Sequence, residues 1–499
     1  MKLFTSEQIL KIEEETIKIE KIHSLNLMER AAEALKSQII EDYKNCEKVF
    51  IFCGNGNNGG DGFALARLLH YEFFNVKIFC DLENLNFKEN AKINFNDLKK
   101  IKDISINDFS EVEKFKIDKN DLVIDALFGI GLNRKIEGKS GELVNILNEI
   151  NAIKIAVDIP SGLFSDEITP DDFIIFKADK TVSFQFWKKA FLYPETGKFC
   201  GEIKILDIGL SHKIIDSEIS RNFIIDDILI ISIYKKRNDF SNKGNFGNSV
   251  IIAGSHGKIG AAVLATKAAL RSGSGLIFTI SPECGNFILQ TSAPEAMFIN
   301  GGENHITNIE LPKNAVCGIG PGLGTDEETE KCVLNFLKNQ TKPLVIDADA
   351  LNIISKNKSI LKSIPENSIL TPHPKEFERL FGITQNSFDR TDLALKMAKE
   401  LKLIIVLKDH HTQIITPQQD VFYNITGNSG MAKGGSGDVL TGILTSLLSQ
   451  KYSSKNAAIF GVWLHGKAGD FAAEKSSKES LLPVDLIKKI GKVFKYIQD

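Results

Sequence analysis

Acidic, amide and hydroxyl side chains stand at the ends of three apolar runs in the first half of the chain. They are Asn57, Asn58 and Asp61 after the first run, Asp125 in the second, and Asp158 and Ser161 after the third. Parallel strands end at one edge of a sheet, so we expect these side chains to share a crevice there. Asn, Asp and Ser oxygens together suit a weakly charged hard cation. The alternative is that these residues only form turns, which use the same residue types.

A GxGxxG pattern occupies the first of these loops, at Gly54, Gly56 and Gly59. With Asp81 at the end of the next apolar run, it indicates a dinucleotide fingerprint. Asp61 argues against a plain fingerprint, because a carboxylate at the helix start would repel a pyrophosphate. Glycines in the other two loops would let ligand phosphates approach backbone N–H groups; these are Gly129, Gly131 and Gly162.

A glycine-rich loop precedes a predicted helix in the second half, in the segment NSGMAKGGSGDVLTGIL (428–444). Free backbone N–H groups at a helix start can hold a phosphate, and glycines remove the Cβ atoms that would block it. Asp438 would lie beside that phosphate, able to take a proton from an attacking hydroxyl. A flexible loop with a capping Asp is the alternative, although AGS, GPGLG, DADALN, TPHPKEF and GGSGD precede or form this loop in that order.

Two series of short apolar runs, alternating with helical or turn-rich stretches, must position these residues. The first forty-odd residues are predicted to be helical, with Thr5 and Gln8 at capping-box spacing. Predicted strands of the first half are 49–53, 76–80, 122–127, 153–157, 181–186 and 201–210. Those of the second half are 249–253, 276–280, 316–319, 344–347, 368–370 and 403–407, with a hairpin at 413–416 and 421–424. Helices are predicted at 261–270, 439–448 and 457–475, the last two finishing the fold. The alternation predicts α/β domains with parallel sheets covered on both faces.

The polar stretch 211–240 is the predicted junction between two α/β domains, residues 1–215 and 222–499. With 61 Lys and Arg against 64 Asp and Glu, the net charge of −3 gives no bulk attraction to nucleic acid. No uncharged run reaches eighteen residues, so no membrane-spanning helix is expected. Seven cysteines without a CxxC pair suit unpaired thiols in a reducing cytosol. We therefore expect a cytoplasmic enzyme with neither nucleic acid nor membrane as a partner.

The motifs GNGNNGGDGFALAR, DALFGIGL and VDIPSGL resemble the N-terminal domain of the NAD(P)H-hydrate epimerases, over roughly residues 1–212. The resemblance implies a Rossmann-like three-layer domain that interconverts the R and S epimers of hydrated NADH or NADPH. It implies a potassium ion coordinated by Asn58, Asp125 and Ser161. It also implies substrate contacts from Asn57, Asn58, Gly59, Gly60, Asp61, Gly129, Ile130, Gly131, Leu132, Asn133, Arg134, Lys135 and Asp158.

Asp158 is the candidate catalytic group of this domain. Epimerisation breaks and remakes a bond beside a ring nitrogen, and a positioned carboxylate could shuttle the proton that reversible loss of water needs. A capping role for Asp158 and a non-catalytic domain that senses dinucleotides are the alternatives.

The order of motifs in the second half resembles the ribokinase-like fold. It is more similar still to the C-terminal dehydratase domain of bifunctional NAD(P)H-hydrate repair enzymes, over about residues 222–499. The resemblance implies contacts with the hydrated dinucleotide from Ala262, Gly322, His373 and Asp438. It implies that the adenosine nucleotide is held by Lys408, Asp409, His410, His411, Thr412 and Gly437.

The implied reaction has two steps. With Asp438 as base, the substrate hydroxyl takes the terminal phosphoryl group of ADP, and phosphate then leaves to give NAD(P)H and AMP. Mg²⁺ would offset the developing charge. ADP is favoured over ATP because both activities lie in one chain, which is the bacterial arrangement. The expected partners are hydrated NADH or NADPH, ADP, and further copies of the chain in a homo-oligomer.

Several alternatives stay open in this half. A kinase for a sugar or a hydroxymethylpyrimidine would share the same base and phosphate loop. His373 could be a buried structural histidine, and Lys408 a solvated strand-end lysine. Asp347, Asp349 and Asn352 could reach a metal through water. The segment KDHHT (408–412) departs from the KGADT-like pattern of the family, which puts nucleotide affinity in doubt.

Overall fold

The computed structural model describes residues 1–498, which form two compact α/β units. One unit comprises Lys2–Ser220, and the chain of the other begins at Arg221. The α/β class predicted for both halves is confirmed by two sheets with mainly parallel strands. In the described residues no helix combines the length and apolar character needed to cross a bilayer.

The N-terminal unit has one parallel sheet in the order β4-β3-β2-β5-β6-β7-β8. Its strands are β2 (Val49–Cys53), β3 (Val76–Cys80), β4 (Ser105–Asp108), β5 (Leu122–Ala126), β6 (Ile153–Val157), β7 (Lys180–Phe184) and β8 (Glu202–Leu206). Its helices are α1 (Ser6–Glu20), α2 (Ser24–Tyr43), α3 (Asn57–Tyr71), α4 (Glu89–Lys99), α5 (Gly138–Glu149), α6 (Pro194–Gly197) and α7 (His212–Ser217). The chain starts in the middle of the sheet at β2, builds outward to β4, and returns to the other side of β2 with β5. This order is typical of dinucleotide-binding folds.

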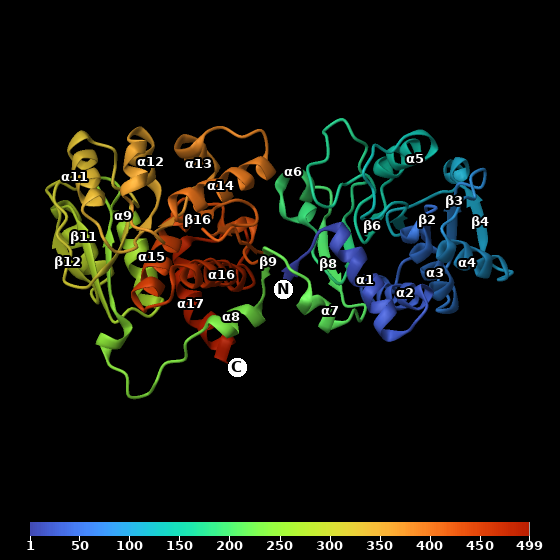
Figure 1. Ribbon diagram of the computed structural model, residues 1–499, viewed down its shortest axis with the longest axis horizontal. Coiled ribbons are helices and arrows are strands. Elements are labelled where there is room, and N and C mark those ends of the chain that lie inside the picture. Colours follow the sequence, from blue (N-terminus) through green and yellow to red (C-terminus); the bar gives the residue numbers. More distant parts are fainter. Residues whose placement is uncertain (499) are drawn as a thin grey trace. The chain divides into compact units, whose positions relative to one another are not determined.

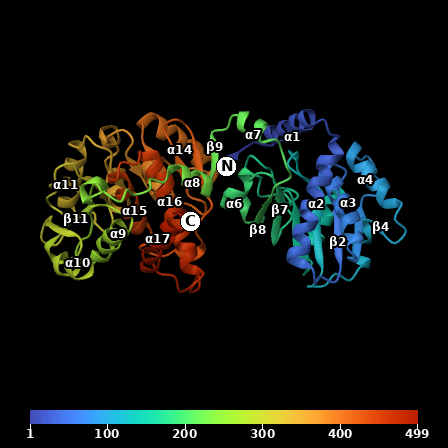
Figure 2. The same ribbon diagram turned by 90° about the horizontal axis from the view of Figure 1, so that it is seen from below.

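Alternate residues of β2 enter two different cores, because successive side chains of a strand point to opposite faces. Val49, Ile51 and Cys53 pack in the core beneath α1–α4, whereas Phe50 and Phe52 pack in the core that contains α5. Figure 1 shows α2, α3 and α4 on one side of this sheet, with α5 on the other, and Figure 2 views the unit from the side of α2 and α3. A strand buried on both faces explains why the sequence of β2 is continuously apolar.

The C-terminal unit has a sheet in the order β9-β18-β17-β16-β15-β14-β13-β10-β11-β12, in which β17 alone runs antiparallel to its neighbours. Its strands are β9 (Asn222–Ile225), β10 (Asn248–Ile252), β11 (Leu276–Ser281), β12 (Met297–Asn300), β13 (Val316–Ile319), β14 (Val345–Ile346), β15 (Ile369–Leu370), β16 (Ile404–Leu407), β17 (Gln413–Ile415) and β18 (Val421–Asn424). Its helices are α8 (Asp227–Ile233), α9 (Ile259–Arg271), α10 (Asn286–Ser292), α11 (Glu327–Lys338), α12 (Ala348–Lys356), α13 (Pro374–Phe381), α14 (Ser387–Leu401), α15 (Ser436–Ser449), α16 (Ser454–Ala473) and α17 (Pro483–Gln498). Helices cover both faces, with α9, α15, α16 and α17 on one side and α11, α12 and α13 on the other (Figures 1 and 2).

Close packing of α9 against α15 fixes the glycine-rich helix start in this unit. A Cβ on Gly442 would lie only 2.1 Å from the carbonyl oxygen of Ala265, so the two backbones approach as only glycine allows. Ala268 lies 2.9 Å from the same point. The second turn of α15, which follows the turn that carries Asp438, is therefore held against the middle of α9.

The structure differs from the predicted elements in three respects. The predicted junction 211–240 contains three elements that were not predicted, α7, β9 and α8. Two predicted helices do not finish the fold, since α17 follows them and buries Leu486, Ile490 and Val493. Strands β4 and β12 were not predicted: both are short edge strands with partly exposed residues, and they lack the continuous apolar run of a central strand.

Candidate active sites

The loops after β2 and β5 meet where the strand order of the N-terminal sheet reverses. The chain leaves β2 toward β3 and leaves β5 toward β6, so the two connections diverge and a crevice opens between them. A cavity of about 470 Å³ lies there. Ten of the predicted substrate residues line it: Asn57, Asn58, Asp61, Gly129, Ile130, Gly131, Leu132, Asn133, Arg134 and Asp158.

Three predicted substrate residues, Gly59, Gly60 and Lys135, lie outside the cavity wall. A Cβ on Gly59 would lie 1.8 Å from the carbonyl oxygen of Gly54, and one on Gly60 would lie 2.7 Å from a side chain of α2. These two glycines therefore let α3 pack closely against its neighbours. The Lys135 Nζ atom lies 2.7 Å from a carboxylate oxygen of Asp172 at the surface.

Asp158 follows β6 in an unusual backbone conformation and carries a buried ion pair. Its φ of 65° is in the left-handed region, which is uncommon for a non-glycine residue. Its Oδ1 atom accepts hydrogen bonds from Lys188 Nζ (2.6 Å), Phe184 N (3.1 Å) and Ser183 Oγ (3.2 Å). The Lys188 side chain is only 1% exposed, and its ammonium also donates to Ser183 Oγ at 2.6 Å. All three donors converge on Oδ1, and in the described chain Oδ2 makes no hydrogen bond and remains available to a ligand.

The three predicted cation ligands are linked through the backbone of Phe128. Asp125 accepts from Ser161 Oγ at 2.6 Å and from Ser161 N at 2.8 Å. Ser161 Oγ in turn accepts from Phe128 N, and Asn58 Nδ2 donates to Phe128 O at 3.1 Å. The Asn58 Oδ1 atom is buried and has no hydrogen-bond partner among the described residues. A buried oxygen without a donor is costly unless a ligand or ion satisfies it.

Two further carboxyls line the cavity beside Asp158. Asp61 does not stand at the helix start as expected, because α3 begins at Asn57 and places it after the first turn. Burial raises the pKa of Asp61 well above its usual range, and the charges of Asp158 and Glu13 raise it further. Glu13, on α1, was not predicted as a site residue. Neither Glu13 nor Lys188 stands in a motif whose spacing signals a site.

In the C-terminal unit, a partly buried lysine lies next to the glycine-rich helix start. The Lys408 Nζ atom donates to Asp347 Oδ1 at 2.8 Å, and Asp347 Oδ2 accepts from Thr441 Oγ1 at 2.7 Å. A Cβ on Gly437 would lie 3.6 Å from Lys408 Nζ and 3.7 Å from Asp347 Oδ2. The ammonium therefore faces the space that glycine leaves open at the first turn of α15, where backbone N–H groups have no intrahelical acceptor. The Lys408 side chain is 23% exposed and paired with Asp347, so it differs from a freely solvated strand-end lysine.

Asp438 faces this charged pair from the first turn of α15. Burial raises the pKa of Asp438 to about 6, the carboxylates of Asp347 and Asp349 contribute to the rise, and Lys408 opposes it. A carboxylate with this pKa is mostly ionised at neutral pH and binds a proton more strongly than an ordinary aspartate. Asp438 thus has the protonation behaviour of a general base.

His373 begins α13 as its N-cap. Its Nδ1 atom accepts from Lys375 N at 3.1 Å, and the Glu376 carboxylate accepts from His373 N at 2.9 Å. The side chain is 43% exposed, so His373 is not a buried structural histidine. Glu376, which sequence reasoning did not select, lies 3.9 Å from Lys408 Nζ and extends the charged cluster.

The segment 408–412 forms the turn between β16 and β17, and its unusual residues are paired within the protein. Asp409 makes an ion pair with Arg390 at 3.3 Å. The Nδ1 atom of His411 lies 3.2 Å from Asn424 O, and burial lowers the pKa of His411 to about 4. The His410 and His411 rings pack edge to face at 4.6 Å. Predicted nucleotide contacts from Asp409–Thr412 stay predictions.

Gly322 lies beside the start of α9 at the second reversal of strand order, between β10 and β13, where a Cβ on it would lie 3.0 Å from Ala261, the neighbour of Ala262. Gly322 has a φ of 62°, and Ser255 Oγ donates to its carbonyl oxygen at 2.8 Å. A Cβ on Gly322 would lie 2.9 Å from the carbonyl oxygen of Lys258, immediately before α9. A polar cavity of about 640 Å³ adjoins this point and is lined by Ser255 and Lys258 among others.

Comparisons with known proteins match both units. A family model described as "NAD(P)H-hydrate dehydratase" matches residues 249–492, and one described as "YjeF-related protein N-terminus" matches residues 24–190. The chain is 32% identical to the bifunctional NAD(P)H-hydrate repair enzyme Nnr of Moorella thermoacetica, over 96% of this chain and 94% of that protein.

Two solved structures resemble the C-terminal unit. One is an ADP/ATP-dependent NAD(P)H-hydrate dehydratase from Bacillus subtilis co-crystallised with ATP and Mg²⁺, which is 29% identical with a TM-score of 0.48. It covers 55% of this chain and 98% of that chain. The other is a ribokinase-like superfamily protein from Enterococcus faecalis, 28% identical with a TM-score of 0.48, covering 56% and 98%.

The Asp158–Lys188 pair is expected to stabilise the N-terminal unit. Lys188→Met should lower its free energy of unfolding by about 3–5 kcal/mol, because Asp158 is left buried without its counter-charge. The double variant Asp158→Asn/Lys188→Met should recover part of that loss, since neither charge remains. Urea unfolding followed by Trp187 fluorescence measures both, in a Trp463→Phe background that leaves one tryptophan. Equal stability of Lys188→Met and its parent would contradict the expected role of the pair.

Proposed function

The chain belongs to the family of bifunctional NAD(P)H-hydrate repair enzymes, and from this premise we propose that it carries out both reactions of that repair. The N-terminal unit epimerises the R and S forms of hydrated NADH and NADPH. The C-terminal unit converts the S form to NAD(P)H at the expense of ADP, giving AMP and phosphate. The observation that carries the proposal is that each unit places a proposed acid–base carboxyl near a lysine: Asp158 accepts a hydrogen bond from Lys188, and Asp438 interacts electrostatically with Lys408.

Asp158 is the proposed acid–base group of the epimerase. Lys188 and the backbone N–H of Phe184 hold one of its oxygens, which leaves the other directed to the substrate hydroxyl. Gly129 and Gly131 would let the substrate phosphates approach the backbone after β5. Asn57, Asn58, Asp61 and the segment 129–134 are the proposed substrate contacts, because they line the same cavity.

The residues proposed for potassium fit such an ion. Asn58 Oδ1 is a buried oxygen that lacks a donor among the residues described, and Asp125 and Ser161 add a carboxylate and a hydroxyl nearby. Burial raises the pKa of Asp125 to about 6 despite hydrogen bonds from Ser161 and Leu127. A cation beside Asp125 would favour its ionised form and would hold the loops after β2, β5 and β6 in register.

Asp438 is the proposed base of the dehydratase. It takes the proton of the substrate hydroxyl, whose oxygen then bonds to the terminal phosphorus of ADP while the bond from that phosphorus to AMP breaks. Phosphate departs with the electron pair of the carbon–oxygen bond, and loss of a ring proton restores the double bond of NAD(P)H. Lys408 and the N–H groups at Gly437 stabilise the negative charge of the phosphates during transfer. Ala262, Gly322 and His373 are the proposed contacts to the dinucleotide.

Mg²⁺ would accompany the nucleotide rather than occupy a site built by the protein. The described residues contain no group of three or more His, Cys, Asp or Glu side chains that could hold a metal. Mg²⁺ commonly keeps several waters and binds substrate phosphates, so the phosphates of ADP can supply most of its ligands.

Repair of a mixed sample of R and S NADPH hydrate tests the proposal. With ADP, nearly all of the hydrate should return to NADPH, seen as dihydronicotinamide absorbance, and AMP should appear. Asp158→Asn should stop recovery once the S form is used up, and Asp438→Asn should abolish recovery while R-to-S conversion continues. Acid–base groups contribute about 10²–10⁴-fold, so each loss should be large.

Parallel reactions with ATP and without nucleotide complete that experiment. Recovery with ATP but not with ADP would overturn the choice of co-substrate. No recovery with either nucleotide, together with phosphorylation of a sugar or hydroxymethylpyrimidine and release of ADP, would replace the dehydratase with a small-molecule kinase. Unchanged R-to-S conversion in Asp158→Asn would favour a domain that only senses dinucleotides. The rates are corrected for spontaneous epimerisation in the absence of enzyme.

The dehydratase should lose activity in mild acid. Its base must be ionised, and the pKa of Asp438 is raised to about 6, so kcat/KM should fall about tenfold per pH unit below that value. Asp349→Asn removes a negative charge that raises this pKa, so its acid limb should lie at lower pH. Rates measured with the S hydrate and saturating ADP test this. A constant rate from about pH 7 down to about pH 5 would exclude Asp438 as the titrating base.

Gly437→Ala should separate nucleotide binding from stability. The new Cβ meets no atom closer than 3.6 Å, so the fold should accept it, and alanine stabilises a helix by about 0.5–1 kcal/mol relative to glycine. The same methyl group occupies the space in front of Lys408 Nζ, so ADP affinity measured by calorimetry should fall at least about tenfold. Gly491→Ala on α17, outside the glycine-rich loop, is the control, because its Cβ meets nothing within 4 Å. Equal ADP affinity in both variants would place the phosphates elsewhere.

A further inference from the structure

Helix α1 forms one wall of the N-terminal cavity. Leu10, Glu13 and Ile17 face it at helical spacing, and Glu13 supplies the wall's carboxylate. Asp61 and Asp158 line the same cavity from α3 and from the end of β6. Three carboxyls from separate elements therefore surround the space in which we propose that the nicotinamide ring binds.

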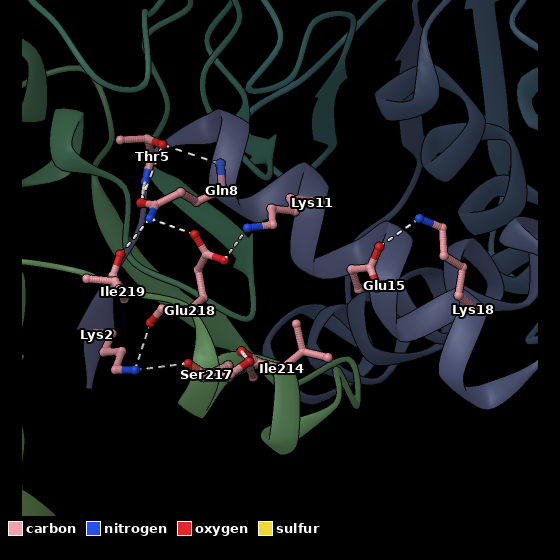
Figure 3. Close-up of polar contacts among 11 residues, drawn as sticks. Lys2, Thr5, Gln8, Lys11, Glu15, Lys18, Ile214, Ser217, Glu218 and Ile219 are labelled. Atoms are coloured by element: carbon pink, nitrogen blue, oxygen red, sulfur yellow. Dashed lines mark hydrogen bonds and ion pairs between the residues drawn. The ribbon is translucent and has the colours of Figure 1, made fainter.

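The position of α1 is fixed by polar contacts at its amino end (Figure 3). Thr5 and Gln8 form the predicted capping box, which is confirmed. Gln8 Nε2 donates to Glu218 Oε1 at 3.0 Å, and Lys11 Nζ pairs with Glu218 Oε2 at 2.7 Å. These contacts anchor the turn that precedes Glu13, so its carboxyl is presented by a rigid element.

The carboxyl of Glu13 is neither neutralised nor hydrogen-bonded within the described part of the chain. Burial and, to a smaller extent, the charge of Asp158 raise the pKa of Glu13 to about 7, although Lys188 opposes the rise. Glu14 on the same helix also contributes to the rise. At neutral pH Glu13 can therefore either give or accept a proton, whereas Asp158 is paired with an ammonium. Carboxyls whose environments differ in this way commonly divide the acid and base roles of a reaction.

Epimerisation of the hydrate demands proton transfer on both faces of the ring. When the carbon–oxygen bond breaks, its electron pair leaves with the hydroxyl oxygen, which takes a proton and departs as water. The lone pair of the ring nitrogen forms a carbon–nitrogen double bond. Water then adds to the opposite face, the double-bond pair returns to nitrogen, and a base removes the extra proton. One fixed side chain cannot reach both faces.

We propose that Glu13 is the second proton-transfer group of the epimerase, and that it serves the face of the nicotinamide ring opposite Asp158. This inference rests on the epimerase activity proposed above. In one direction Glu13 protonates the departing hydroxyl and Asp158 accepts the proton of the incoming water. In the other direction their roles are exchanged. Proton exchange with solvent restores the starting state after each turnover.

An oxygen-exchange experiment distinguishes proton transfer by Glu13 from a general disturbance of the site. Glu13→Gln, Asp158→Asn and wild-type enzyme receive each purified epimer of NADPH hydrate in H₂¹⁸O, without ADP. Chromatography measures inversion and mass spectrometry measures ¹⁸O in the ring hydroxyl. Glu13→Gln should lose at least about 100-fold in inversion, yet still exchange oxygen in the one epimer whose hydroxyl faces Asp158. Asp158→Asn should retain exchange in the other epimer.

Glu14→Gln is the matched control, because Glu14 is the exposed neighbour of Glu13 on the same helix. Its inversion rate should stay within about twofold of wild type. If Glu13→Gln inverted the hydrate at the wild-type rate, the proposed role of Glu13 would be overturned and the epimerase assignment would stand. Loss of exchange in both epimers, or exchange of the same epimer in both variants, would overturn the assignment of one group to each face. Failure of the wild-type enzyme to invert the hydrate would instead overturn the epimerase function.

Discussion

The reversal of strand order in a parallel sheet is the constraint on which both candidate sites depend. In the N-terminal unit it separates the loops after β2 and β5, and in the C-terminal unit the loops after β10 and β13. Because connections diverge at such a point, a crevice remains that helices do not fill. A cavity adjoins each reversal, lined in one unit by Asp158 and in the other by Ser255 beside Gly322. The topology of the sheet alone therefore brings together residues that are distant in the sequence.

Each unit also pairs a lysine with a strand-end aspartate, but the two pairs have different consequences. Lys188 binds the proposed catalytic carboxylate itself, that of Asp158. Its buried ammonium also donates hydrogen bonds to Ser183 Oγ and Phe184 O. Lys408 binds Asp347, which is not the proposed base. A buried charge is tolerated when it is paired. The first pair orients the proposed reacting carboxylate, and the second places a positive charge where the phosphates of the proposed nucleotide would lie.

The sequence predicts the central strands and the loops of both sites, since buried parallel strands leave a continuous apolar signal and their ends carry polar residues. It does not predict β9 or α8, because each is a short apolar segment flanked by charged residues, which weaken its hydrophobic pattern. Helix α17 also escapes, although Ile487 and Ile490 follow helical spacing. In the sites, Asp158 and Asp438 stand in recognisable motifs, whereas Lys188 does not. Its role depends on where the chain after β7 turns, which no local pattern specifies.

Contact geometry separates glycines that packing requires from those that only a ligand explains. Cβ atoms on Gly54 and Gly59 would lie within 2 Å of backbone atoms, so these positions are glycine for the fold. Gly56 and Gly131 have open space beside them and no left-handed φ, yet both line the N-terminal cavity. Neither packing nor backbone conformation demands glycine there. Close approach of the proposed ligand to the main chain would demand it, as in phosphate-binding loops. The GxGxxG pattern thus combines two positions that hold α3 against the sheet with one that faces the cavity.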